Sequence, residues 1–229
     1  MRTNGRPRSL RLLVATLLLA LLAGACAGDG ELGSPTLGGA PAAKVGGFEI
    51  TNADLRDDVE SWAANAEMLQ AIGVRDIGAP GRRSAQLVAF VLSHEIVSEQ
   101  ARLMLADVRS QADSGDIDLA ELGVDGEALG EPGDDEIQAM LDELDQGFQG
   151  PDGSSVFAEF PDDFRRQLAT DLVYQDRLGV VMQAGLEAPE VEVNPRYGTV
   201  ELLQGGIAQV RPPSGPLPAP IGGGAELGA

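Results

Sequence analysis

The sequence predicts a mainly α-helical fold, a small bundle of about four helices with one or two short terminal strands. Apolar residues recur at helical spacing in four segments, and Gly, Pro or Asp residues interrupt the chain between these segments. Hydrophobic residues make up 43% of the 229-residue chain but aromatic residues only 4%, which favours helices over a ring-rich β-sandwich. A chain of this length suits one domain of ordinary size.

The first elements expected are a short extended segment at 44–50 and a helix after it. Thr51 can cap the N-terminus of this helix, because an acidic residue follows three positions later. Apolar residues from Leu55 to Leu69 then fall at steps of three and four, and Gly73 ends the pattern. The spacing therefore predicts one helix between Thr51 and Gly73.

Three further helices and a second short strand are expected after this one. The longest helix runs from Ser84 to about Ala112 and has a broad apolar face, so it is the expected central helix. A narrower apolar stripe predicts a helix over 134–147, and Pro161 opens a fourth helix that Gly185 closes. Alternation at 191–193 predicts the second strand.

Residues 1–25 have the layout of a secretory signal peptide. A basic stretch precedes twelve residues of mostly apolar character, Leu12 to Ala23, and small residues follow. A helix needs about 20 apolar residues to span a bilayer, so this run indicates export rather than a permanent span. Cleavage after Ala25 would release a soluble protein, whereas the sequence that ends at Cys26 resembles a bacterial lipobox.

The position of the single cysteine favours the lipoprotein alternative. A lone thiol directly after the apolar run has little packing role, so we expect Cys26 to be lipidated with palmitate-type acyl chains. The protein is then a lipoprotein on the outer, extracytoplasmic face of a bacterial cytoplasmic membrane. Residues 26–43 form the expected flexible tether, 44–204 the domain, and 205–229 a Pro/Gly-rich disordered tail, whose prolines could alternatively serve as a polyproline ligand.

The charge balance excludes some classes of partner. Acids outnumber bases 36 to 16, which gives a net charge of −20. Such a chain repels phosphate backbones and anionic headgroups, so we expect no nucleic-acid binding, and membrane contact only through the lipid. One cysteine also excludes an internal disulfide.

No motif predicts an enzyme, a metal site or a cofactor. His94 and Glu95 begin a pattern like H-E-x-x-H, but Ser98 stands at the last position and His94 is the only histidine, so a packed histidine is expected instead. The acidic stretch 113–121 lacks the alternating ligands and glycine of an EF-hand. Neither a G-x-S-x-G elbow nor a P-loop or G-x-G-x-x-G fingerprint is present, and we expect no catalytic residues.

Three segments lie in a fixed order along the chain: AKVGGFEITNADL at 43–55, the long helix with Leu92 and Ile96, and VEVNPRYG at 191–198. Together they resemble the SurA N-terminal domain family, and the last is similar to the closing segment of this domain in actinobacterial lipoproteins. The resemblance covers most of the expected domain. Gly46 departs from it, because the family usually has Asn at this position.

The resemblance implies a SurA/PrsA-like, ATP-independent chaperone module that binds unfolded or extended segments of newly exported proteins. In this family the module is often joined to a parvulin-type prolyl isomerase domain. The segment after Gly198 is short and rich in Pro and Gly, so we expect that catalytic domain to be absent. Two alternatives remain open: a lipoprotein scaffold that binds one dedicated protein partner, and residual isomerase activity.

Aromatic and methionine side chains are the candidates for binding such segments, because they adapt to varied partners. Each of them could instead belong to the structural core. The candidates are Trp62, Met68, Leu69, Met104, Phe148 and Met182.

Overall fold

The computed structural model describes residues 40–122, 124, 126–183 and 186–213. Within these ranges the chain forms six α-helices and seven short strands, so the expected mainly α class is confirmed. The seven strands make three small sheets, whereas only one or two strands were expected. The predicted signal peptide, Cys26 and most of the predicted tether lie outside the described residues.

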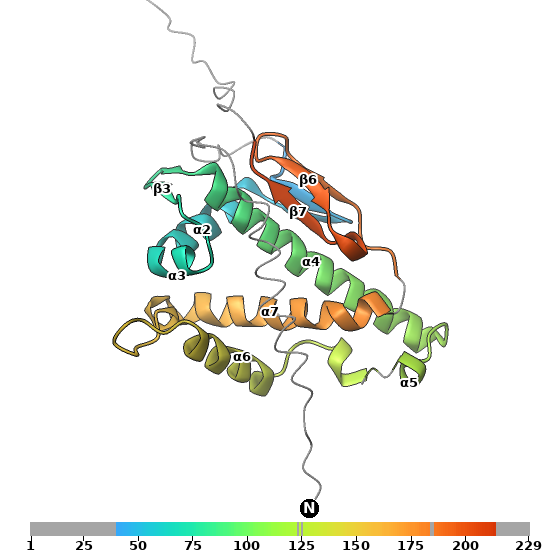
Figure 1. Ribbon diagram of the computed structural model, residues 1–229. Coiled ribbons are helices and arrows are strands. Elements are labelled where there is room, and N and C mark those ends of the chain that lie inside the picture. Colours follow the sequence, from blue (N-terminus) through green and yellow to red (C-terminus); the bar gives the residue numbers. More distant parts are fainter. Residues whose placement is uncertain (1–39, 123, 125, 184–185, 214–229) are drawn as a thin grey trace, which may run out of the picture.

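Two long helices form the centre of the molecule (Figure 1). They are α4 (Ala85–Ser114) and α7 (Asp162–Gln183), which pack against one another. The Ser84 hydroxyl accepts a hydrogen bond from the Leu87 N–H at the start of α4, and Gly115 in left-handed conformation ends the helix. The predicted central helix is therefore present with nearly the expected bounds.

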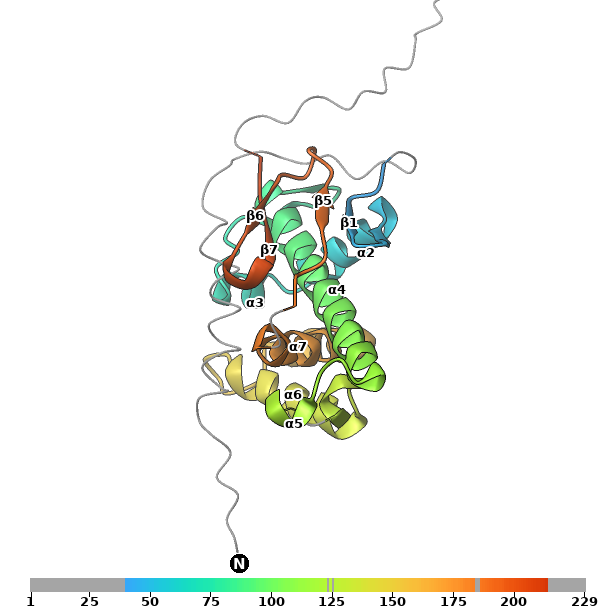
Figure 2. The same cartoon turned by 90° about the vertical axis from the view of Figure 1, so that its right-hand side faces the viewer.

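The remaining helices surround this pair. Helix α6 (Asp134–Gly147) lies along α7 in both views (Figures 1 and 2). A short helix α5 (Leu119–Leu122) and a 3₁₀ turn (Gly126–Leu129) occupy the stretch between α4 and α6, where the sequence predicted an acidic loop. Another 3₁₀ turn (Phe157–Glu159) precedes α7.

The first predicted helix is divided in two. Helix α2 (Asn52–Ala63) begins after Thr51, whose side chain accepts from the backbone of Asp54 as expected, and α3 (Ala66–Ala71) follows it. The division lies at Asn65, whose side-chain oxygen caps α3 and whose amide donates to the Val156 carbonyl at 2.7 Å. Apolar periodicity continues through both helices, which is why it did not indicate the break.

Two small sheets lie on the side of α4 opposite α7. A separate hairpin has two residues in each of its strands. Strands β2 (Phe48–Ile50), β1 (Ala43–Val45) and β5 (Val191–Val193) form an antiparallel sheet in this order. Strands β6 (Thr199–Leu202) and β7 (Ala208–Arg211) form the second sheet, joined by a 3₁₀ turn at Gln204–Gly206. The hairpin pairs β3 (Gly78–Ala79) with β4 (Arg82–Arg83).

The fold continues past residue 205, where the sequence predicted a disordered tail. Strand β7 lies on α4, with Ala208 and Val210 buried. The Val210 N–H donates to Ser93 Oγ at 2.9 Å, and the Ala208 N–H donates to Gln100 Oε1 at 3.0 Å. The domain therefore extends into the segment that glycine and proline content alone assigned to the tail. At the other end, Ala43 is buried in β1 rather than part of a tether.

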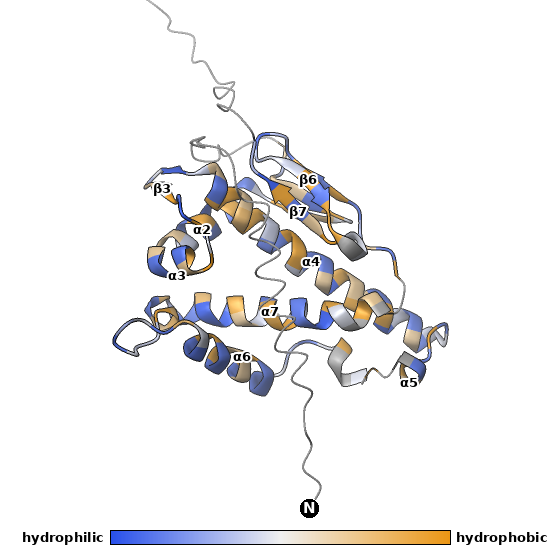
Figure 3. Ribbon diagram, in the orientation of Figure 1, coloured by the Kyte–Doolittle hydropathy of each residue, from blue (hydrophilic) through white to orange (hydrophobic). Residues whose placement is uncertain are grey.

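The core between α2, α4 and α7 contains most of the aromatic residues. The Trp62 ring makes edge contacts with Phe90 at 5.1 Å between centroids, with Phe164 at 5.5 Å and with Phe160 at 6.3 Å. Figure 3 shows that α4 is apolar along much of its length, whereas polar residues cover much of α6. A few aromatic residues are therefore enough to fill this part of the core, because they pack around one tryptophan.

Replacing Trp62 with Ala is expected to lower the free energy of unfolding by about 3–5 kcal/mol, because it removes a buried ring and leaves a cavity. Urea denaturation followed by circular dichroism measures the change. Phe48→Ala is the matched control, because Phe48 is 48% exposed and its loss leaves no cavity. A Trp62→Ala variant as stable as the control would contradict a core role for Trp62.

Ending the chain after Gln204 is expected to destabilise the domain by at least about 3 kcal/mol relative to a chain that ends after Pro213. The shorter chain lacks the buried side chains of Ile207 and Val210 and leaves the apolar surface of α4 beneath β7 uncovered. Thermal unfolding of both chains provides the comparison. Equal unfolding temperatures would show that β7 contributes nothing to stability.

Candidate functional site

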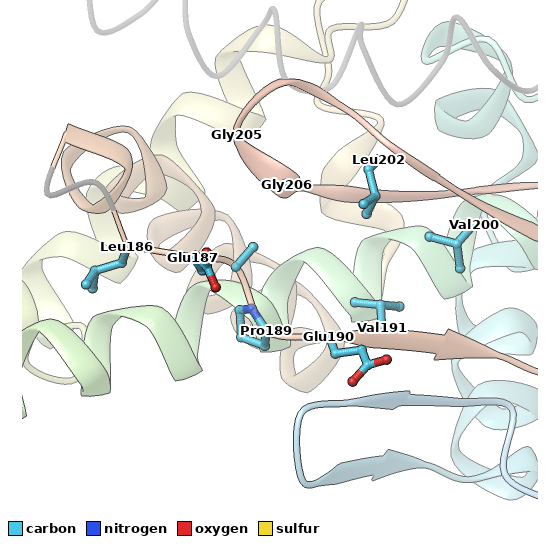
Figure 4. A pocket seen from close by; sticks show the side chains of 10 residues that line it. Leu186, Glu187, Pro189, Glu190, Val191, Val200, Leu202, Gly205 and Gly206 are labelled. Atoms are coloured by element: carbon cyan, nitrogen blue, oxygen red, sulfur yellow. The ribbon is translucent and has the colours of Figure 1, made fainter.

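A groove of about 700 Å³ lies between the segment that follows α7 and the β6–β7 hairpin (Figure 4). Its lining is mostly apolar, and Figure 4 shows Val191 and Leu202 pointing into the space between β5 and β6. Leu202 is 66% exposed, an unusual exposure for a large apolar side chain. We call this feature the strand groove. Its lining residues are Leu186, Glu187, Ala188, Pro189, Glu190, Val191, Val200, Leu202, Gly205 and Gly206.

The turn at the end of β6 requires glycine. Gly205 has φ +82°, and a Cβ atom at this position would lie 2.0 Å from Met182 Cε. A larger residue would therefore be strained and would also collide with the end of α7. Met182 thus packs under the turn that bounds the groove.

Two strands border the groove, and each has backbone groups that point away from its paired strand. Glu190 and Asn194 make backbone hydrogen bonds to the β1 side, through Gly46 at 2.8 Å and Ala42 at 2.9 Å. By alternation in an antiparallel ladder, Val191 directs its backbone N–H and C=O away from β1. Strands β5 and β6 lie close together but are not paired in one sheet.

The other strand that borders the groove is β6. The Leu203 N–H donates to the Ile207 carbonyl across the hairpin at 2.8 Å, so Val200 and Leu202 direct their backbone groups away from β7. The same two residues also line the groove with their side chains. The groove therefore combines apolar side chains with outward-directed strand backbone, the two features that bind an extended peptide by strand addition.

Acidic residues lie at the groove and beside it. The side chains of Glu187 and Glu190 are exposed in its lining. On the neighbouring sheet, Lys44 is paired with Glu49 at 2.8 Å, and this partner raises the pKa of the lysine. The groove thus favours apolar segments that carry a basic residue.

The six residues expected to bind clients do not gather at one surface. Trp62, Met68, Leu69 and Met104 are all buried in the core. Phe148 packs partly buried against the same core near the end of α6, on a different part of the molecule from the strand groove. Met182 is not one of the residues that line the groove, but it packs beneath the Gly205 turn at its border.

The sequence analysis did not identify the groove residues Val200 and Leu202. A usable signal was present, because Val200 and Leu202 alternate with polar residues and Gly205-Gly206 is a hairpin-type dipeptide. Assigning residues 205–229 to a tail removed the partner strand from consideration. Without β7 as a partner, the alternation of Val200 and Leu202 with polar residues did not predict a strand.

A second candidate site is a group of buried and half-buried polar side chains between α2, α4 and α7, which we call the polar cluster. It consists of Asp58, His94, Glu95, Asp171 and Gln175. His94 is 2% exposed; its Nε2 lies 3.6 Å from Asp171 Oδ2, and its Nδ1 lies 3.2 Å from Gln175 Nε2. The expected packed histidine is therefore buried, but in a polar and acidic setting.

Arg102 and Ser98 complete the surroundings of the cluster. Arg102 binds the second oxygen of Asp171 and also lies 3.4 Å from Glu99 Oε2. Ser98 Oγ donates to the His94 carbonyl and accepts from the Gln175 amide at 2.8 Å. The serine hydroxyl therefore does not bond the imidazole, and the arrangement is not that of a nucleophilic serine activated by a histidine.

Two carboxyl groups of the cluster, those of Glu95 and Asp58, hold protons more tightly than usual. Burial raises the pKa of Glu95 to about 7, and burial together with the neighbouring Asp54 raises the pKa of Asp58 to about 6. The pKa of His94 is also raised: burial opposes the charged ring, but Asp171 and Glu95 together outweigh that effect. The cluster therefore carries more negative charge than its bases balance.

The chain matches no family model, no curated protein and no solved structure. Across the described ranges, none of the helices has the length and apolar character that a bilayer-spanning segment requires.

The free energy of unfolding is expected to rise as the pH falls from about 7 to about 5. Glu95 and Asp58 have raised pKa values in the folded state, so in this window the folded chain binds more protons than the unfolded chain, and protonation favours folding. The raised pKa of His94 changes the free energy of unfolding in the same direction, because this group too binds protons more tightly in the folded chain. Urea denaturation at a series of pH values measures the slope.

Glu95→Gln is expected to flatten this slope and to increase stability at pH 8 by on the order of 2 kcal/mol, because it removes a half-buried carboxylate whose charge His94 and Arg102 offset only in part. The exposed Glu67 supplies the control, Glu67→Gln. An unchanged pH slope in Glu95→Gln would show that Glu95 does not cause it.

Proposed function

We propose that the protein binds extended, largely apolar segments of other proteins in the strand groove and acts as a lipid-anchored, chaperone-like module outside the cytoplasm. The observation that carries the proposal is the exposed Leu202, which faces Val191 across an apolar groove between two strand edges. Exposed apolar surface of this kind on a water-soluble domain is typical of an interaction site.

The geometry of the groove favours an extended ligand over a helical one. Val191 on β5 and Val200 and Leu202 on β6 present outward backbone groups beside apolar side chains. A peptide strand added to either edge would gain backbone hydrogen bonds that do not depend on its sequence. Binding of this type suits unfolded chains, whose only shared features are apolar side chains and backbone.

The charge of the chain supports the same function. A net charge of −20 keeps a loaded complex soluble while apolar residues are covered. The exposed Glu187 and Glu190 add a preference for segments with Lys or Arg next to apolar residues. The resemblance to the SurA N-terminal family and a lipid at Cys26 would place this binding where exported proteins emerge from the membrane.

The second candidate function is a scaffold for one dedicated protein partner. The confined size of the strand groove favours it, because about 700 Å³ accommodates only a few side chains. The two functions differ in breadth: a chaperone-like module binds many unrelated apolar segments, and a scaffold binds one.

Leu202→Asp is expected to reduce the suppression of aggregation. The full chain, mixed at near-equimolar ratio with a chemically unfolded test protein, should lower light scattering, and the variant should lose most of this effect. The reason is that the introduced carboxylate would place a charge in the apolar groove without disturbing the core, since the Leu202 side chain is largely exposed.

Phe48→Asp is the matched control for this experiment. It introduces the same charge at an exposed apolar residue that β1 and β5 separate from the groove. Equal loss in both variants would contradict a role of the groove. If the folded wild-type chain does not suppress aggregation at all, the general chaperone function fails and the dedicated-partner function remains.

A further inference from the structure

Three side chains with metal-binding chemistry converge within the polar cluster. His94 and Glu95 come from α4 and Asp171 from α7, and one potential ligand atom of each lies within 4.8 Å of the others. We propose that His94, Glu95 and Asp171 bind a first-row divalent cation, with Zn²⁺ as the best match. This site is separate from the strand groove and does not depend on the proposed function.

The type and spacing of the donor atoms support this cation. One imidazole nitrogen with two carboxylate oxygens suits Zn²⁺ better than Ca²⁺ or Mg²⁺, which prefer oxygen alone. Bonds of about 2.0–2.1 Å in tetrahedral geometry separate ligand atoms by roughly 3.4 Å. His94 Nε2 and Asp171 Oδ2 already lie 3.6 Å apart, too far for a good hydrogen bond but close to this spacing.

Neighbouring side chains orient two of the three ligands. Arg102 holds one oxygen of Asp171 and leaves Oδ2 directed at the imidazole. Gln175, which is 3% exposed, holds the other side of the ring at Nδ1. Outer contacts of this kind, one on a ligating carboxylate and one on a ligating histidine, are characteristic of built metal sites.

The amide of Gln175 can hold His94 in the tautomer that a cation requires. Its Oε1 is buried and has no hydrogen-bond partner in the described structure. Metal binding at His94 Nε2 requires a proton on Nδ1, and exchanging the two ends of the amide places the oxygen where Nδ1–H can donate to it. The amide is thus able to accept from the imidazole in the cation-bound form.

The charge of the site also favours a cation. Arg102 is shared between Asp171 and Glu99, so it offsets the charge of Glu95 only in part, and Asp58 lies nearby as well. Buried carboxylates without positive partners are costly, and a divalent ion removes this cost directly. Glu95 is only partly buried, which provides a route for the ion from solvent.

The chain contains a reporter for this site. Trp62 is the only tryptophan, and its ring centroid lies 5.5 Å from that of His94. The full chain, freed of metal with a chelator and dialysed, is titrated with Zn²⁺ while Trp62 fluorescence and binding heat are recorded. We expect saturable binding of one Zn²⁺ per chain with a change in fluorescence, and no comparable response to Ca²⁺.

Three variants decide whether the named residues bind the ion. Glu95→Gln and Asp171→Asn remove ligands at constant size, and Gln175→Met removes the contact to Nδ1 together with the hydrogen bond to Ser98; we expect each to weaken Zn²⁺ binding about 10–100-fold. Glu67→Gln is the control and should bind like the wild type. Circular dichroism establishes that each variant is folded, and Glu95→Gln, at a partly exposed position, keeps the test valid if Asp171→Asn unfolds.

Three results would overturn the proposal. One is the absence of saturable Zn²⁺ binding to the folded wild-type chain. Another is equal affinity in Glu95→Gln and Glu67→Gln, which would place the ion elsewhere on this acidic protein. A response to Ca²⁺ as strong as that to Zn²⁺ would also contradict a site in which the imidazole is a ligand.

Discussion

The whole structure depends on the burial of α4 around most of its circumference. Helix α7 covers one side of α4 and the small sheets cover the other. Without α4, neither α7 nor the sheets would have a core to pack against. A helix in this position cannot be purely apolar, because the strand that lies on it carries backbone donors. Ser93 and Gln100 supply the acceptors for these donors, and their hydrogen bonds fix β7 on the helix.

Sequence periodicity predicted the helices well and the sheets poorly. Thr51 and Ser84 are local capping signals, and the structure uses both as expected. The break at Asn65 depends on a hydrogen bond to Val156, 91 residues away, which no local pattern reports. Strand β7 was missed for a similar reason: its stability comes from α4, whereas glycine and proline around it indicate disorder.

The two candidate sites differ in how much of them was visible in the sequence. His94 was noticed, but its partners Asp171 and Gln175 lie 77 and 81 positions away and meet it only because α4 and α7 pack together. Aromatic and methionine residues were expected at a binding surface, yet most of them build the core. In a chain with so few aromatic residues, the fold itself needs nearly all of them.

The side-chain acceptors on α4 have a consequence for how the protein behaves at high concentration. An exposed strand normally invites a second copy of the same chain to pair with it, which leads to polymers. Gln100 and Ser93 occupy the N–H groups of Ala208 and Val210, so β7 offers no template to another copy. In copies crowded on a surface, as the proposed lipid anchor would hold them, strand pairing would therefore use an open edge such as that of β6, where a second copy and an extended peptide compete.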